Sequence, residues 1–209
     1  MLNYQTIGDT ALATSPYPYM VIRNAIDLNK LPAVMRDFPA IDHPGSIPLD
    51  AVSGGPGFYQ LIEELQGSKF RQLIEQKFAM NIGDRPTLLT LRGQMRNKDG
   101  RIHTDSKTKL ITVLLYLNEN WEGQEGHLRI LNNGDDIENF VEEIPPLAGT
   151  MVIFKVTDNC WHGHKPVVGK RLSIQLNYLT SAAAHEKHQL FHGLSAKLKK
   201  MFSPKAYAD

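Results

Sequence analysis

The stretch that decides the fold runs from His103 to Arg171. It opens with His103-Thr104-Asp105 and closes with Trp161-His162-Gly163-His164-Lys165-Pro166-Val167-Val168-Gly169-Lys170-Arg171. If His103 and Asp105 lie on a strand, their side chains share one face, because strand side chains alternate with a period of two. His162 follows Asp105 by 162 − 105 = 57 residues, and Arg171 follows His162 by 171 − 162 = 9. Two imidazoles and one carboxylate form the facial triad that binds Fe(II) and leaves coordination positions open. The pattern therefore predicts an iron site.

Length and composition indicate an ordinary globular chain. The 209 residues fit one domain, with 42% hydrophobic and 22% charged residues. A formal net charge of +1 provides no basic field for nucleic acid, so we expect no nucleic-acid partner. Cys160 is the only cysteine, which excludes an intramolecular disulfide and suits a reducing compartment. Without a secretory signal or an apolar run long enough to cross a membrane, we expect a soluble, cytoplasmic protein.

The first part of the chain, residues 1–85, is expected to be a helical support region. Pro18–Ile22 is strand-like, and Asp27 is placed to cap a helix that runs on through Met35. Apolar residues then recur at three- and four-residue spacing over Phe58–Phe78, interrupted near Gly67. This periodicity predicts helices that pack against the back of a sheet.

From Pro86 onward the residue pattern is typical of strands, and residues 86–180 are expected to form the core of the fold. The predicted strands cover Thr87–Met95, Ile102–Asp105, Leu110–Leu117, His127–Leu131, Phe140–Ile144, Gly149–Phe154 and Arg171–Leu179. Helices first and strands afterwards, without alternation, indicate an α+β domain with a mainly antiparallel sandwich or barrel. A jelly roll is the expected form, since it encloses a ligand-sized space between its sheets.

The tail, residues 181–209, has an apolar stripe at helical spacing within His185–Pro204, with lysines largely elsewhere around it. An amphipathic helix of this kind either docks on its own domain or lies on the surface, where a membrane or an acidic partner could bind it.

Four segments in this order carry a resemblance to a known family. They are His103-Thr104-Asp105, Leu114–Asn118, Gly126–Ile130 and the stretch from His162 through Pro166 to Arg171. From about Arg92 to Leu179 the chain resembles the prolyl-4-hydroxylase-like branch of the 2-oxoglutarate/Fe(II) dioxygenases. The resemblance implies a double-stranded β-helix (jelly roll), Fe(II) as the cofactor, and 2-oxoglutarate and O2 as co-substrates.

The resemblance also implies roles for individual residues. His103, Asp105 and His162 match the catalytic metal ligands. Arg171 matches the residue that binds the distal carboxylate of 2-oxoglutarate, a task for which a planar guanidinium is suited because it pairs bidentately and stays charged. Tyr116 matches a position whose phenol bonds the same carboxylate in some relatives; the alternative is a plain core or rim tyrosine.

His162 and His164 are both available as the third ligand. A proline at +4 and an arginine at +9 from His162 fit the family register, so we assign the ligand to His162 and expect His164 to be either a pocket-edge or a solvated histidine. On the last strand, alternation from Arg171 puts Ser173, Gln175 and Asn177 on the same side as the arginine. Gln175 is therefore the best candidate for a further contact, either with the co-substrate or with a residue that supports the metal ligands, and Asn177 is expected near the substrate mouth. Gln94 and Arg96, on the strand before the turn, have an ambiguous facing.

The resemblance implies an enzyme that hydroxylates its substrate while 2-oxoglutarate is converted to succinate and CO2. The presence of Asp105 favours hydroxylation over halogenation, because the halogenases of the family have no carboxylate at that position. Where the oxygen-sensing relatives place a tyrosine ten residues before the first ligand, this chain has Gly93. The substrate is therefore expected to be a small molecule or a glycan-related metabolite. One alternative is a protein or peptide (prolyl-type) hydroxylase, with Ser53–Gly57 and the basic tail as a binding surface. Another is a non-catalytic metal-binding jelly roll or ligand sensor.

Overall fold

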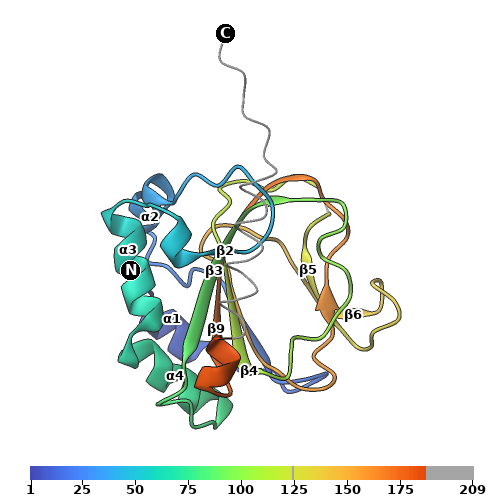
Figure 1. Cartoon of the computed structure of the whole chain (residues 1–209). Coiled ribbons are helices and arrows are strands. Elements are labelled where there is room, and N and C mark those ends of the chain that lie inside the picture. Colours follow the sequence, from blue (N-terminus) through green and yellow to red (C-terminus); the bar gives the residue numbers. More distant parts are fainter. Residues whose placement is uncertain (124, 187–209) are drawn as a thin grey trace.

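A six-stranded antiparallel sheet separates four helices on one side from a small three-stranded sheet on the other (Figure 1). The computed structural model describes residues 1–123 and 125–186. The large sheet has the order β1-β7-β4-β9-β3-β2 and the small sheet the order β6-β5-β8. The strands are Tyr19–Ile22 (β1), Ile47–Pro48 (β2), Thr87–Met95 (β3), Lys109–Tyr116 (β4), Leu128–Leu131 (β5), Phe140–Ile144 (β6), Met151–Lys155 (β7), His162–Gly163 (β8) and Gly169–Leu179 (β9). Two antiparallel sheets in a mixed α/β chain agree with the predicted jelly-roll class.

The helices cover the outer face of the large sheet. They are Tyr4–Asp9 (α1), Leu31–Asp37 (α2), Pro56–Gln66 (α3) and Ser68–Phe78 (α4), with a 3-10 turn at Leu49–Ala51 (η1). The predicted break near Gly67 is confirmed, because Gly67 ends α3 and precedes α4. The apolar stripes of α3 and α4 are buried in one core with the outward-facing apolar residues of the sheet. This helical layer keeps the central strands in place from behind.

The helix predicted to start at Asp27 begins later. The Asp27 carboxylate accepts a hydrogen bond from the backbone N–H of Asn29 at 2.8 Å, and α2 starts at Leu31 with Pro32 in its first turn. Proline has a fixed φ and no N–H, so it is suited to the first turn of a helix, and here it accompanies the later start.

The predicted strand Ile102–Asp105 is wrong as a regular strand. Only His103 pairs there, in an isolated bridge with His162. The reason is that β3 is already paired with β2 and β9, and β4 with β7 and β9, so the segment between β3 and β4 cannot pair beside either of the strands that it connects. It crosses instead toward the small sheet.

The predicted tail helix lies outside the described residues from position 187 onward. Within the described residues, no helix is both long and apolar enough to cross a membrane.

Candidate active site

A cavity of about 380 Å³ lies against the inner face of the large sheet. Its floor is built by the three central strands in register. Arg92, Ser173 and Tyr116 form one row, Thr90, Gln175 and Leu114 the next, and Leu88, Asn177 and Thr112 the third. Strand side chains alternate between the two faces, and this brings polar residues of β9 to the cavity and Leu172, Ile174, Leu176 and Tyr178 to the core. The predicted facing of Arg171, Ser173, Gln175 and Asn177 is confirmed.

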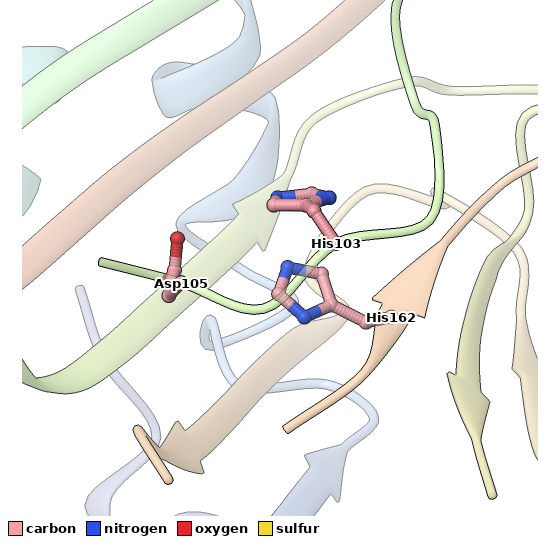
Figure 2. A group of neighbouring side chains, drawn as sticks. All are labelled: His103, Asp105 and His162. Atoms are coloured by element: carbon pink, nitrogen blue, oxygen red, sulfur yellow. The ribbon is translucent and has the colours of Figure 1, made fainter. Parts of the chain in front are cut away.

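His103, Asp105 and His162 come together at one wall of this cavity (Figure 2). His103 and Asp105 come from the loop between β3 and β4, and His162 comes from β8. One potential ligand atom from each residue lies within 4.8 Å of the other two. Figure 2 shows the three side chains pointing toward one another. This arrangement is compatible with a single metal ion that touches all three.

Backbone carbonyls fix the tautomers of both histidines. Nδ1 of His103 lies 2.8 Å from the carbonyl oxygen of Arg101, and Nδ1 of His162 lies 2.8 Å from that of Cys160. A carbonyl oxygen only accepts, so each Nδ1 carries the proton and each Nε2 keeps a lone pair for a metal. Burial, together with the neighbouring His103, lowers the pKa of His162 to about 4. His162 is therefore neutral at pH 7, as a metal ligand must be.

Both carboxylate oxygens of Asp105 are held by neighbours. Lys109 Nζ donates to Oδ1 at 2.7 Å, and the Thr112 hydroxyl donates to Oδ2. Burial opposes ionisation of this carboxyl, but Lys109, His162 and Thr112 outweigh it, so the pKa of Asp105 is lowered. A carboxylate has about four lone-pair sites, so these two contacts leave room for a metal. The two nitrogens and one oxygen fit the chemistry of a divalent iron site with open positions.

The support of Asp105 continues along the cavity floor. The Thr112 hydroxyl accepts a hydrogen bond from Asn177 Nδ2 at 2.8 Å, and Asn177 Oδ1 accepts one from Gln175 Nε2 at 3.1 Å. Gln175 thus lines the cavity as expected, and its amide is the outer end of this chain of contacts. Its proposed contact with the co-substrate remains a prediction.

Arg171 lies buried at the other end of the floor, beside Tyr116. Its Nε donates to the carbonyl oxygen of Gly126 at 3.0 Å, and its guanidinium also donates to the Tyr116 hydroxyl at 3.3 Å. The guanidinium carbon lies 4.9 Å from the centre of the Tyr116 ring. These contacts use two of the five N–H donors of an arginine, and the residue lines the cavity, so a carboxylate there could bind it.

The other histidine considered as a ligand, His164, stands apart from the triad. It lines the cavity, and its Nδ1 donates to the carbonyl oxygen of Lys165 at 2.8 Å. Burial and the charge of Arg171 lower its pKa to about 4. Gly100 packs directly on the imidazole: a Cβ added at Gly100 would lie 2.1 Å from Cε1 of His164. These contacts with Gly100 and Lys165 hold the His164 imidazole in one position. The group of possible metal ligands does not include His164.

Arg92 is a cavity residue that the sequence did not single out. It lines the cavity, while Gln94 and Arg96 do not; Arg96 instead pairs with Asp99 at 3.0 Å. The register between β3 and β9 shifts between Arg92 and Gln94, as in a β-bulge. Gly93 faces the opposite way, and a Cβ added there would lie 2.4 Å from Cβ of Ile41. Alternation along Thr87–Met95 could have pointed to Arg92, but the bulge could not be read from the sequence.

The Ser53–Gly57 segment, expected as a possible surface for a peptide, is held by α2. Gly55 N–H donates to the Asp37 carbonyl oxygen at 2.8 Å, and Gly57 N–H donates to the Asp37 carboxylate at 2.7 Å. The segment leads directly into α3, on the helical side of the large sheet.

Residues 93–179 match the family model described as the 2OG-Fe(II) oxygenase superfamily. The matched segment begins just after Arg92 and contains all three triad residues and Arg171. A search among curated proteins finds no significant match.

Several solved structures share the fold at low sequence identity. A Pseudomonas putida prolyl-4-hydroxylase is 17% identical with a TM-score of 0.56, covering 86% of this chain and 99% of that one. The viral collagen prolyl hydroxylase of Paramecium bursaria chlorella virus-1, in a 2OG complex, is 16% identical with a TM-score of 0.50, covering 78% and 96%. HygX from Streptomyces hygroscopicus, solved with nickel and 2-oxoglutarate bound, is 12% identical with a TM-score of 0.51, covering 78% and 83%. The chain thus shares its fold with two proteins described as prolyl hydroxylases and with HygX.

Proposed function

We propose that the chain is an Fe(II)- and 2-oxoglutarate-dependent dioxygenase, because residues 93–179 match the family model of the 2OG-Fe(II) oxygenase superfamily and the fold resembles that of a prolyl-4-hydroxylase. It hydroxylates an organic substrate and releases succinate and CO2. The observation that carries the proposal is the convergence of His103, Asp105 and His162 on one cavity that also holds Arg171.

Each residue has a task that follows from its surroundings. The Nε2 atoms of His103 and His162 and one oxygen of Asp105 hold Fe(II). Arg171 and Tyr116 bind the distal carboxylate of 2-oxoglutarate, because their N–H and O–H groups meet at the opposite end of the cavity floor. Together the bound iron and 2-oxoglutarate supply the activation of O2.

The protein contributes ligand geometry, co-substrate orientation and a partly apolar cavity wall. Leu88, Leu114 and Leu128 line the cavity beside the polar groups and limit bulk water there. The triad has a carboxylate at Asp105, the position that family halogenases leave vacant, so the site supports hydroxylation. The chain of contacts through Thr112, Asn177 and Gln175 keeps this carboxylate in one orientation.

We place a small molecule or glycan-related metabolite first as the substrate class. The peptide alternative is kept because two of the solved structures that share the fold are described as prolyl hydroxylases. The Ser53–Gly57 segment is hydrogen-bonded to Asp37 of α2, so it gives the peptide alternative no support. A non-catalytic metal-binding protein or sensor would need the same triad without turnover, and it is the outcome that the test must separate.

The test reconstitutes the purified chain anaerobically with Fe(II), adds 2-oxoglutarate and then O2, and measures succinate. Succinate formation that His103→Ala abolishes is the expected result. A cell extract incubated with the loaded protein should contain a product heavier by one oxygen atom. If calorimetry shows tight binding of the metal and of 2-oxoglutarate, but no cell extract leads to succinate formation, the protein is a sensor instead. If the chain binds neither the metal nor 2-oxoglutarate, the proposal is overturned.

A further inference from the structure

The side chain of Arg92 lines the cavity. It extends from β3 beside Ser173 of β9, in the row that ends at Tyr116. Among the described residues, no hydrogen bond or ion pair engages its guanidinium, whereas Arg171, Arg96 and Arg129 each have such contacts. Asp99, the carboxylate that attracts Arg92 most, is already bound by Arg96 through its side chain and its backbone N–H.

The surroundings of Arg92 are unfavourable for a positive charge. Burial lowers its pKa, and the neighbouring charges of Arg171 and Arg96 lower it further, against the attraction of Asp99 and Asp105. Arg92 is partly buried, and a partly desolvated charge without a partner costs free energy. The donors of Arg92 are therefore available to a ligand that enters the cavity.

The charges of the cavity indicate the sign of that partner. Four lining side chains are formally charged: Arg92, Lys109 and Arg171 are positive and Asp105 is negative, which leaves +2. In the proposed function, Fe(II) adds two positive charges and 2-oxoglutarate adds two negative ones, so the loaded cavity keeps +2. The whole chain has a net charge of only +1, so this excess is local.

We propose that Arg92 is a specificity residue that binds an anionic group, a carboxylate or a phosphate, on the primary substrate. The inference rests on the proposed function, in which Arg171 and Tyr116 bind the 2-oxoglutarate carboxylate. A planar guanidinium with all its donors available pairs bidentately with either anion. The substrate is then a small anionic molecule, oriented by Arg92 with the carbon to be hydroxylated toward the triad.

The test uses inorganic phosphate as the probe. The full chain is loaded with Mn(II) and saturating 2-oxoglutarate, and phosphate binding is measured by calorimetry in wild type, Arg92→Gln, Arg92→Lys and Arg23→Gln. Arg92→Gln should weaken phosphate binding about tenfold or more, since it removes hydrogen bonds to a charged group. Arg92→Lys should retain most of the affinity. Arg23 is exposed and does not line the cavity, so Arg23→Gln controls for the loss of one positive charge.

The same titrations separate this inference from the proposed function. The affinities of all four proteins for Mn(II) and 2-oxoglutarate are measured first; if wild type binds neither, the proposed function fails. If 2-oxoglutarate binds normally but phosphate binds wild type and Arg92→Gln equally, or binds neither, the anion site is refuted. If Arg92→Gln weakens 2-oxoglutarate binding instead, Arg92 belongs to the co-substrate site and the inference is overturned.

A second measurement addresses the substrate itself. Small molecules of a cell extract are divided on an anion-exchange resin at neutral pH, and each fraction is tested for faster succinate formation and for a product heavier by one oxygen. Activity in the retained fraction, lost in Arg92→Gln, supports the inference. Activity confined to the unretained fraction contradicts it.

Discussion

The backbones of His103 and His162 exchange two hydrogen bonds, each 3.0 Å long, in an isolated bridge between the loop before β4 and the strand β8. The two imidazoles consequently lie with their ring centres 4.3 Å apart. The main chain therefore sets the separation of two proposed metal ligands that are far apart in sequence, before any ion binds.

His162→Ala should abolish Mn(II) binding, whereas His164→Ala should leave the Mn(II) affinity close to that of wild type. The reason is that only His162 lies in the group of converging ligand atoms, although both imidazoles line the cavity. Electron paramagnetic resonance of free Mn(II) in titrations measures both affinities. Loss of binding in His164→Ala with retention in His162→Ala would reverse the ligand assignment.

Thr112→Val should weaken metal binding by roughly 10- to 100-fold, the usual effect of removing a group that orients a ligand. The valine keeps the shape of the side chain but cannot donate to Asp105 or accept from Asn177. Thr90→Val is the matched control, because Thr90 lines the same cavity, while the described side-chain donors to Asp105 are Lys109 and Thr112. Equal affinities in the two variants would show that the chain of contacts has no role in metal binding.

Arg171→Gln should raise the Kd for 2-oxoglutarate roughly 100-fold, since two charge-assisted hydrogen bonds to a carboxylate are lost. Calorimetry with Mn(II) present measures this Kd. Arg171 also holds the Gly126 carbonyl, so thermal unfolding of the variant must be recorded beside it. An unchanged Kd in a folded variant would remove Arg171 from the co-substrate site.

Tyr116→Phe should raise the same Kd by roughly 3- to 10-fold, the contribution of one hydrogen bond. The hydroxyl bonds to Arg171, so the effects of the two substitutions should not add in the double variant. Strict additivity would indicate that Tyr116 is a core tyrosine that does not share the carboxylate.

The metal-free protein should lose stability as the pH falls from about 6.5 to about 4, partly through His164. Its folded pKa of about 4 lies below the ordinary value of 6.5, so the unfolded chain binds the proton first. The contribution of neutral His164 to the free energy of unfolding is on the order of 3 kcal/mol above pH 6.5, and it has been lost at pH 4. Urea unfolding of wild type and His164→Asn should show a shallower decline for the variant; parallel curves would contradict the assignment.

The sequence predicted the parts of the fold that repeat. The stripes over Phe58–Phe78 and the apolar run before Tyr116 indicated helices behind a sheet, and spacing with family resemblance indicated His103, Asp105 and His162. The reason given for the His103–Asp105 proximity was only partly right, because a single bridge replaces the expected strand. Pairing partners and bulges depend on contacts between distant segments, and for this reason Arg92, Lys109 and Thr112 emerged only from the structure.

The bulge at Gly93 also decides where the substrate range of this cavity could be redesigned. Position 93 is closed to any larger residue, because Ile41 occupies the space of a Cβ, so a tyrosine cannot be introduced there without displacing the loop that carries Ile41. Variation at Arg92 and Thr90, by contrast, changes side chains that already face the cavity. A mutant library aimed at new substrates should therefore keep Gly93 and vary positions 92 and 90.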